Sequence, residues 1–244
     1  MSAICVITAR GGSKRIPRKN IRGFCGKPII AYSIEAAISS NIFDEVMVST
    51  DDEEIATISR RYGASVPFLR SAQSSDDYAS TPDVLKEVLD EYERLGRYFD
   101  IICCLYPTAP FVTADELNEA VVILNQTGAP SVIPVTVFDF PPQRAFAIAP
   151  NGTIQYAEPE YAMARSQDLP ARVHDCGRFY FSRVDAFRGS GSLVMEGTVP
   201  MMISPHLVQD IDTPEDWAIA EMKYRLAFCK GDRVVKDGIV LEGE

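Results

Sequence analysis

Several common catalytic signatures are missing from this chain of 244 residues. Only two histidines are present, and the sequence contains no HExxH pattern, no zinc-type Cys/His spacing and no Ser–His–Asp order. These absences exclude the usual sites of zinc hydrolases and serine hydrolases. The six cysteines form no CxxC pair, so a dithiol redox site is excluded as well. We expect buried free thiols in a reducing, cytoplasmic compartment.

Long hydrophobic runs are also missing. No stretch approaches the ~18 apolar residues of a membrane-spanning helix. The apolar run AICVI near the N-terminus is too short for a signal peptide, and it precedes the first positive charges instead of following them. We therefore expect neither a membrane span nor a signal peptide. The net charge of −10 argues against nucleic acid and anionic membranes as partners.

Acidic residues are absent from the start of the chain, where the first is Glu35. The segment before it carries seven Lys and Arg residues, so the rest of the chain carries a net charge of −17. Most of this positive charge lies in TARGGSKRIPRKN (8–20), between a predicted strand and a predicted helix. A local basic cluster on an acidic protein favours a small, highly charged anion as the ligand.

The glycines of this loop indicate a phosphate-binding turn. We expect Gly11 and Gly12 to adopt positive φ and to bring backbone N–H groups close to a ligand. Arg10, Lys14 and Lys19 would add charged donors. Neither GxxxxGK[ST] nor GxGxxG is present, so the loop is not a P-loop, and the pattern argues against a dinucleotide site. A solvated basic loop without a ligand is the alternative.

Strand and helix patterns alternate along the chain. Continuous apolar runs predict strands, and apolar residues at helical spacing behind Ser/Thr caps predict helices. Strands are expected at 3–9, 44–50, 65–70, 100–108, 130–137 and 177–183. Helices are expected at 27–40, 52–63, 81–96, 113–128 and 213–228, with Thr81, Thr113 and Thr213 as caps. This order predicts a doubly wound, mostly parallel α/β sheet that binds ligands beyond the carboxyl ends of its strands.

The alternation breaks between residues 138 and 176. This segment is rich in proline, has weak periodicity and holds a hairpin candidate around Asn151–Gly152. We expect one domain over 1–228 that includes 138–176 as an irregular excursion, followed by a tail at 229–244. On the sequence alone, the excursion could equally be a dimerisation element or a lid.

Two acidic residues stand just before the last predicted helix, in QDIDTPED (209–216). Asp210 and Asp212 are two positions apart, and side chains at this spacing in an extended segment point the same way. Paired carboxylates suit Mg²⁺ that is shared with phosphates. The alternative is that these acids only complement the helix dipole. Ser80, in the polar segment 70–83, could hold a base or ribose, or could belong to a helix cap.

Together, and in this order, the motifs resemble those of the CMP-sugar synthetases, the acylneuraminate-type cytidylyltransferases. That family begins with a strand and an A-R-x-G-S-K-x-x-P-x-K-N loop, which matches ARGGSKRIPRKN (9–20). Further likeness lies in GKPIIAYSI (26–34), VSTDDEEIA (48–56), YGA (62–64), RSQDLP (165–170) and DIDTPEDWAIAE (210–221). The resemblance covers about residues 3–228 and implies a Rossmann-like sheet of the nucleotide-diphospho-sugar transferase type.

Two segments differ from the sialic acid branch of this family. LYPTAPF (105–111) has Tyr106 where that branch has glutamine, and HDCGRFY (174–180) departs from its N-G-A-I-Y-like segment. Both look more like the pseudaminic acid cytidylyltransferase branch. The resemblance therefore implies transfer of CMP from CTP to pseudaminic acid, a nine-carbon acidic sugar, with release of pyrophosphate. The product would serve surface glycan or flagellin glycosylation.

The resemblance also implies roles for individual residues. The catalytic residues would be Arg10, Lys19 and Asp212, and the ligands of Mg²⁺ or another divalent ion would be Asp210 and Asp212. The nucleotide would be bound by Arg10, Gly11, Gly12, Ser13, Lys14, Lys19, Asn20 and Ser80. The sugar would be bound by Tyr106, Arg165, Gln167, His174 and Asp175, with Arg165 on its carboxylate. A homodimer formed through 138–176 is implied as well.

Three questions stay open. The proton of the attacking hydroxyl could be removed through metal polarisation or by Asp212, since no side chain is an obvious general base. The same reaction could use N-acetylneuraminic acid, legionaminic acid or the eight-carbon acid of lipopolysaccharide. The chain could also be a non-catalytic nucleotide-binding module, because a fold does not determine a function.

Overall fold

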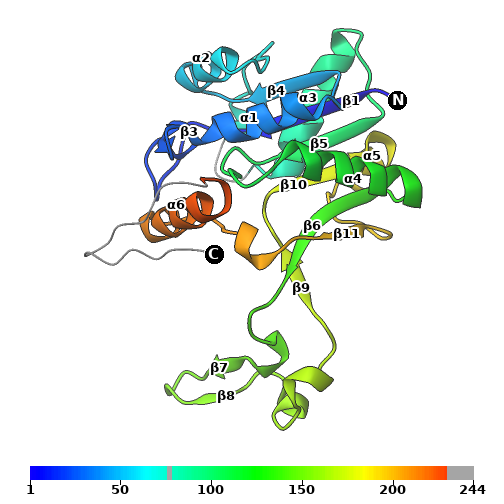
Figure 1. Cartoon of the computed structure of the whole chain (residues 1–244). Coiled ribbons are helices and arrows are strands. Elements are labelled where there is room, and N and C mark those ends of the chain that lie inside the picture. Colours follow the sequence, from blue (N-terminus) through cyan, green and yellow to red (C-terminus); the bar gives the residue numbers. More distant parts are fainter. Residues whose placement is uncertain (76–78, 230–244) are drawn as a thin grey trace.

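Most strands of the central sheet are parallel, and the antiparallel strand β10 lies in its middle. The computed structural model describes residues 1–75 and 79–229, and within them seven strands share one sheet in the order β11-β6-β10-β5-β1-β4, with β9 paired to β6. The bounds are β1 (Ala3–Thr8), β4 (Glu45–Ser49), β5 (Ile101–Leu105), β6 (Ser131–Val137), β9 (Val173–Asp175), β10 (Phe179–Arg183) and β11 (Val199–Met202). β1 runs parallel to β4 and β5, and β6 to β11, whereas β9 and β10 are antiparallel to their neighbours. The predicted α/β sheet is confirmed (Figure 1).

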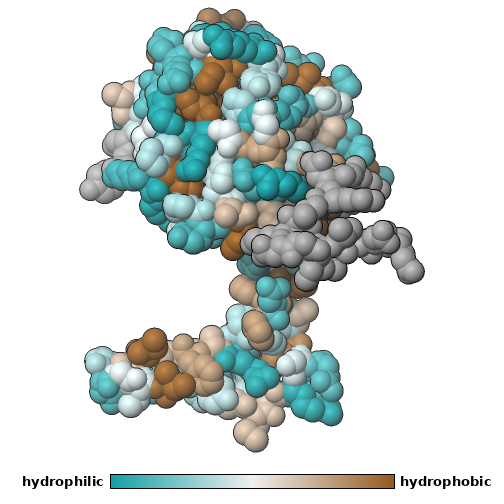
Figure 2. Space-filling view, turned by 60° about the vertical axis from the view of Figure 1, so that its left-hand side comes forward, coloured by the Kyte–Doolittle hydropathy of each residue, from teal (hydrophilic) through white to brown (hydrophobic). Residues whose placement is uncertain are grey.

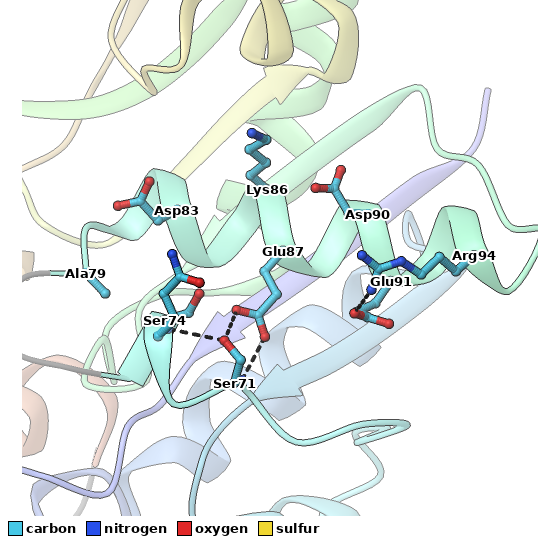
Figure 3. A pocket seen from close by; sticks show the side chains of 10 residues that line it. Ser71, Ser74, Ala79, Asp83, Lys86, Glu87, Asp90, Glu91 and Arg94 are labelled. Carbon is cyan, nitrogen blue, oxygen red and sulfur yellow. Dashed lines mark hydrogen bonds and ion pairs between the residues drawn. The ribbon is translucent and has the colours of Figure 1, made fainter.

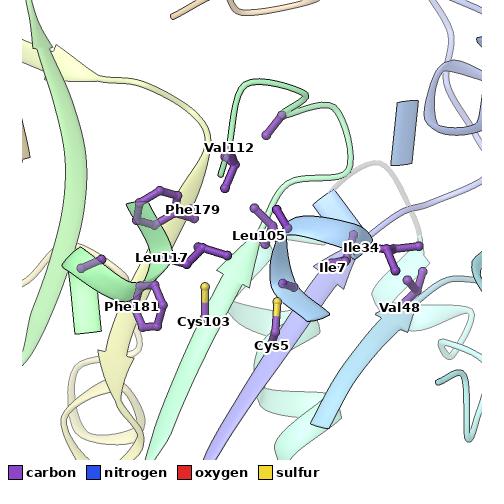
Figure 4. Close-up of a cluster of buried hydrophobic side chains, with 14 of the residues drawn as sticks. Cys5, Ile7, Ile34, Val48, Cys103, Leu105, Val112, Leu117, Phe179 and Phe181 are labelled. Carbon is purple, nitrogen blue, oxygen red and sulfur yellow. The ribbon is translucent and has the colours of Figure 1, made fainter. Parts of the chain in front are cut away.

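Helices cover both faces of the sheet, because successive strand residues point to opposite faces. The bounds are α1 (Ile29–Ser40), α2 (Glu53–Arg61), α3 (Thr81–Arg94), α4 (Ala114–Thr127), α5 (Val184–Ser190) and α6 (Pro214–Phe228). Cys5 and Ile7 lie in one buried cluster with residues of α1, α2 and α4 (Figure 4). Ile4 and Val6 lie in another with residues of α3 and α5. Burial of each large apolar side chain stabilises the folded state by about 1.5–3 kcal/mol. The packed helices on both faces therefore hold the strands, and the loops at their ends, in position.

Capping residues decide where the helices begin. Thr113 and Thr213 cap α4 and α6 as predicted, each in a reciprocal capping box with the acidic residue three positions on. The predicted cap of α3 is wrong by one position. The hydroxyl of Ser80, not of Thr81, accepts the backbone N–H of Asp83, and the Ser80 amide donates to the Asp83 carboxylate. The Ser80 hydroxyl assigned to the nucleotide is therefore already part of a helix cap.

The predicted strand at 65–70 is wrong. In the described part of the chain this segment contributes no more than an isolated bridge between Ser65 and Met47. Pro67 has no N–H to donate, which disfavours a longer ladder. The start of α1 is also shifted, because a ribbon of β2 (Gly23–Phe24) and β3 (Lys27–Pro28) precedes it.

An arm, residues 138–172, extends from the body between β6 and β9 (Figure 1). The predicted hairpin is confirmed as β7 (Phe146–Ile148) and β8 (Ile154–Tyr156), with Gly152 at φ +80° in its turn. Gln143 is 1% exposed and donates to the Pro170 carbonyl at 2.7 Å, which joins the two sides of the arm. Figure 2 shows apolar patches on the arm, and its exposed apolar residues include Phe140, Phe146, Ile148, Ile154 and Met163.

Among the described helices, none has the length and apolarity that crossing a membrane requires. The predicted tail at 229–244 lies outside the described residues from position 230 onward.

Candidate functional site

A hollow opens at the carboxyl ends of β1 and β5, where a doubly wound sheet places its ligands. Its volume is about 590 Å³. It is lined by Thr8, Arg10, Ser13, Lys14, Arg15, Ile16, Lys19, Asn20, Tyr106, Pro107, Thr108 and Asp212. Among these, four side chains are cationic and one is a carboxylate, so we call it the basic hollow. The structure thus brings the basic loop, Tyr106 and Asp212 together from distant parts of the sequence.

Gly11 is required by close packing rather than by an unusual backbone angle. A Cβ at position 11 would lie 2.9 Å from Asp52 Oδ2. The prediction that Gly11 and Gly12 adopt positive φ is wrong, since neither is among the described residues with positive φ. The Gly11 amide donates to Asp51 Oδ1 at 2.8 Å, and the Ser13 amide to the Gly11 carbonyl at 3.0 Å. Both amides would have to exchange acceptors before they bound a phosphate.

Arg18 and Asn20 hold the basic loop in place. Arg18 has φ 55°, and its guanidinium donates to both carboxylate oxygens of Asp52 at the start of α2. The hydrogen bond from Arg18 lowers the pKa of Asp52, so this anchor stays charged. Asn20 is 6% exposed and donates from Nδ2 to the Arg10 carbonyl at 2.9 Å. Asn20 therefore supports the turn that carries Arg10, and its contact with a nucleotide stays a prediction.

Asp212 is bridged to the basic loop by two cations. Arg15 Nη2 lies 2.8 Å from Asp212 Oδ2, and Lys19 Nζ lies 3.4 Å from Asp212 Oδ1. Lys19 also donates to the Ile211 carbonyl at 2.7 Å. Arg15 was not predicted, because it occupies a variable position of the family loop pattern. Its only signal in the sequence was its charge.

Asp210 and Asp212 line different hollows, whereas their spacing predicted a single site. In residues 1–75 and 79–229, no three Asp, Glu, His or Cys side chains gather in a group that could hold a metal ion. Asp212, 35% exposed in the basic hollow, nevertheless fits Mg²⁺. This ion keeps several waters and binds through one or two carboxylates together with substrate phosphates.

A second hollow of about 450 Å³ borders β6, β9 and the segment before α6. It is lined by Thr136, Val137, Asp139, His174, Asp175, Cys176, Gly177, Pro205, Val208, Gln209, Asp210 and Lys223. We call it the acidic hollow, since three carboxylates line it. His174 and Asp175, both predicted to bind the sugar, border this hollow, but their side chains point to opposite faces of the sheet because they are successive residues of β9. The Tyr180 hydroxyl and the Gly177 amide donate to Asp175 at 2.5 and 2.7 Å, which fixes its carboxylate.

Tyr106 links the basic hollow to Tyr180 on β10. It lines the basic hollow, and its ring centroid lies 5.5 Å from that of Tyr180, which donates to Asp175 in the acidic hollow. Burial raises the pKa of both tyrosines, so their hydroxyls stay protonated donors. The Tyr106 amide donates to the Arg178 carbonyl at 2.9 Å, which ties this turn to β10.

Arg165 and Gln167 are brought to neither hollow. Both lie on the arm, at the one-turn helix η5 (Ser166–Asp168). The Arg165 side chain is 73% exposed and pairs with Asp168 at 2.7 Å. Figure 1 shows the arm projecting away from the sheet. The predicted contact of Arg165 with the sugar is therefore not formed within one chain in this structure.

Arg70 was not predicted, although it lies beside the basic hollow. A smaller hollow of about 200 Å³ shares Thr8 and Arg10 with the basic hollow and is also lined by Arg70 and Thr81. Arg70 Nη2 donates to the Ser49 carbonyl at 2.6 Å, and burial lowers the pKa of its guanidinium. The sequence did not point to Arg70, because it is the last residue of the strand expected at 65–70 and belongs to no motif.

A further hollow, about 610 Å³, runs along the outer face of α3 (Figure 3). Its polar side chains bind one another. The amide and hydroxyl of Ser71 donate to Glu87 at 2.8 Å, and Arg94 pairs with Glu91. Such mixed charges are typical of a solvated helix face, and we assign this hollow no role.

Comparison with known proteins identifies the family of the chain. The sequence model of a family described as cytidylyltransferase matches residues 4–170. The chain belongs to the cytidylyltransferase family. Pseudaminic acid cytidylyltransferase from Campylobacter jejuni serotype O:2 is 41% identical over 226 residues, which are 93% of this chain and 97% of that protein. CMP-N,N'-diacetyllegionaminic acid synthase from Legionella pneumophila is 36% identical over 231 residues, 91% of this chain and 95% of that protein.

Solved structures share the fold of this cytidylyltransferase. CMP:2-keto-3-deoxy-manno-octonic acid synthetase complexed with CTP superposes with a TM-score of 0.66 over 93% of this chain and 99% of that chain, at 18% sequence identity. The predicted Rossmann-like nucleotidyltransferase fold is therefore confirmed. The predicted resemblance to the pseudaminic acid branch is confirmed as well, because that branch supplies relatives that match nearly the whole chain.

Proposed function

We propose that this cytidylyltransferase transfers CMP from CTP to pseudaminic acid and releases pyrophosphate. The observation that carries the proposal is the basic hollow, which four cationic side chains and Asp212 line at the ligand-binding edge of the sheet. This charge balance suits a triphosphate and its divalent ion. Two Campylobacter jejuni relatives named for pseudaminic acid, 41% and 40% identical, support the choice of sugar. The use of CTP and six free cysteines support a cytoplasmic reaction.

The nucleotide would occupy the basic hollow and the smaller hollow beside it. Arg10, Lys14 and Lys19 would neutralise the triphosphate through charge-assisted hydrogen bonds. The base or ribose would lie in the smaller hollow, close to Arg70. Asp212 would hold Mg²⁺, which when bound neutralises phosphate oxygens. Asp210, which lines the acidic hollow, would have to turn toward Asp212 to share the ion. Arg15 and Lys19 would then leave Asp212 and turn toward the phosphates.

The sugar's anomeric hydroxyl would attack the α-phosphorus of CTP. A new P–O bond to the sugar forms while the P–O bond to pyrophosphate breaks, and the hydroxyl gives up its proton. Positioning and charge neutralisation dominate such transfers. Asp212 is our candidate to accept the proton, because it is the one carboxylate among the described residues that line the basic hollow.

The choice of sugar is tested by pyrophosphate release with CTP, Mg²⁺ and four acids. These are pseudaminic, N-acetylneuraminic and legionaminic acid and the eight-carbon acid of lipopolysaccharide. We expect kcat/KM to be at least about tenfold higher with pseudaminic acid than with any other, since one well-matched substituent is worth this much. Faster release with another sugar would reassign the substrate. CTP binding without release on any of them would favour a non-catalytic module.

We also propose that the arm forms a homodimer and carries Arg165 to the sugar site of the other subunit. Two observations support this. Arg165 is exposed on the arm and lines neither the basic nor the acidic hollow of its own chain. Phe146, Ile148 and Ile154 on the β7–β8 hairpin are 54%, 78% and 63% exposed, which is a large apolar surface for a monomer.

Mixing two inactive variants tests this arrangement. We expect light scattering to give a dimer, and Arg165→Ala and Asp212→Asn each to be nearly inactive alone. After subunit exchange, the mixed dimer would hold one intact site, so the mixture should recover about a quarter of wild-type activity. Exchange without any recovery would place Arg165 and Asp212 in the same subunit's site.

A further inference from the structure

Each oxygen of the Asp212 carboxylate faces a cation of the basic loop. Arg15 Nη2 lies 2.8 Å from Oδ2, and Lys19 Nζ lies 3.4 Å from Oδ1. Mg²⁺ binds carboxylates through these same oxygens, and a neighbouring positive charge repels it. A divalent ion that binds Asp212 therefore competes with both side chains.

The two cations are held differently. Lys19 also donates to the Ile211 carbonyl at 2.7 Å, and its side chain is only 22% exposed. The Arg15 side chain, which pairs with Asp212, is 66% exposed. An exposed ion pair contributes little to stability, because water and salt screen it. Arg15 is therefore the cation that can leave the carboxylate at low cost, whereas Lys19 has a second anchor.

Asp212 itself is fixed at the entry to α6. Its amide donates to Asp216 Oδ2 at 3.1 Å, and Asp216 forms the capping box of the helix with Thr213. A capping box stabilises the first turn, so the backbone before it has little freedom. An exchange of partners at this carboxylate would therefore move the side chain of Arg15 and leave the backbone of Asp212 in place.

A triphosphate is a stronger acceptor for Arg15 than Asp212 is. Arg15 lines the same hollow as Arg10, Lys14 and Lys19, where the triphosphate would bind. A guanidinium binds phosphate oxygens through parallel charge-assisted hydrogen bonds. The triphosphate also carries several negative charges, whereas Asp212 carries one. The same movement would take a positive charge away from Asp212 and add it to the nucleotide.

We propose that Arg15 makes divalent-ion binding at Asp212 depend on the triphosphate. In the nucleotide-free enzyme Arg15 pairs with the carboxylate and weakens ion binding. With CTP in the basic hollow, Arg15 turns to the phosphates and Asp212 becomes available to the ion. The inference rests on the proposed function, because it assigns the order in which one site takes up nucleotide and ion.

Arg15→Gln tests the inference through two affinities that require no turnover. The electron paramagnetic resonance signal of free Mn²⁺ gives the affinity of the nucleotide-free enzyme for the ion. We expect the Kd for Mn²⁺ to fall about three- to fivefold in the variant, because a competing ion pair is lost. Calorimetry in EDTA gives the affinity for CTP without an ion. We expect the Kd for CTP to rise about tenfold, because a charged hydrogen-bond donor to the phosphates is lost.

Arg22→Gln is the matched control. Arg22 is an exposed cation of the same N-terminal segment, and its guanidinium lies over the Trp217 ring at 5.0 Å. It lines neither the basic nor the acidic hollow. The control removes the same charge, and we expect both Kd values to stay within about twofold of the wild type. Equal shifts in Arg15→Gln and Arg22→Gln would overturn the inference, because the general field of the segment would then explain them.

The direction of the two shifts distinguishes an exchange of partners from damage to the loop. A damaged loop would weaken both affinities, and that result would overturn the inference. An unchanged affinity for either Mn²⁺ or CTP would overturn it as well. Adding Asp212→Asn to Arg15→Gln should abolish the gain in Mn²⁺ affinity, which would assign the gain to Asp212.

The proposed function fails in a different experiment. A wild-type enzyme that bound CTP and Mn²⁺ but released no pyrophosphate with any of the four acids would overturn the proposed function. The two affinities are measured without sugar, so the dependence of ion binding on Arg15 would still stand.

Discussion

Replacing Asp212 with asparagine is expected to lower kcat about 10²- to 10³-fold while CTP still binds. Asparagine keeps the size of the side chain and removes the one carboxylate among the described lining residues of the basic hollow. Arg15 and Lys19, which pair with Asp212 at 2.8 and 3.4 Å, would then turn to the phosphates. Calorimetry without sugar should show CTP affinity that is unchanged or higher, and pyrophosphate release measures turnover.

Asp185→Asn is the control for this prediction. Asp185 is an exposed residue in the first turn of α5 and lines neither hollow, so its variant should turn over at the wild-type rate. A kcat for Asp212→Asn within about threefold of the wild type, a barrier change below about 1 kcal/mol, would remove Asp212 from metal binding and from proton transfer alike.

Replacing Glu116 with alanine is expected to lower the free energy of unfolding by about 3–5 kcal/mol. Arg178 is 4% exposed, and its guanidinium donates to both Glu116 oxygens, at 3.1 and 2.6 Å. Without the carboxylate, the buried charge of Arg178 would lose its counter-ion. The capping box with Thr113 would be lost at the same time. Urea denaturation followed by circular dichroism measures the change.

Two further variants separate charge from side-chain size. Glu91→Ala breaks an exposed pair with Arg94 and should cost less than about 1 kcal/mol. The double variant Glu116→Leu, Arg178→Met should be more stable than Glu116→Ala, because removing both members of a buried pair leaves no charge unpaired. An equal loss of unfolding free energy in Glu116→Ala and Glu91→Ala would contradict this prediction. It would mean that water can solvate the Arg178 charge and that the Arg178–Glu116 pair does not stabilise the packing of α4 near β10.

Several predictions that depend on neighbouring residues agree with the structure. Short-range contacts decide the helix caps Thr113 and Thr213 and the hairpin turn at Gly152. The residues that make these contacts are a few positions apart, so the sequence alone predicts them. The strand expected at 65–70 fails for a local reason too, since Pro67 cannot donate to a ladder. The sheet itself follows from the alternation of strands and helices, so the edge that holds the site could be predicted.

Predictions that require distant segments to meet agree less well. Spacing placed Asp210 and Asp212 in one site, yet they line different hollows. Arg165 matches a family motif, but it lies on the arm and lines neither hollow of its own chain. A sequence motif gives the residue type and not the position of its side chain in the folded protein. Arg15 stands at a variable position of the loop pattern, and Arg70 belongs to no motif. Each became visible only when packing placed its charge against a hollow.

The strand pair β6–β9 both carries the arm and forms a wall of the acidic hollow. Thr136 and His174, which line the hollow, are directly paired in that ladder. A ligand in the hollow and a second subunit bound to the arm would therefore both contact elements that β6 and β9 hold in place. Thermodynamic linkage makes any such influence mutual: the factor by which arm pairing changes sugar affinity equals the factor by which the sugar changes arm pairing. In the proposed dimer, a ligand in this hollow would therefore shift the association of the subunits, and the subunit concentration would shift the affinity for that ligand.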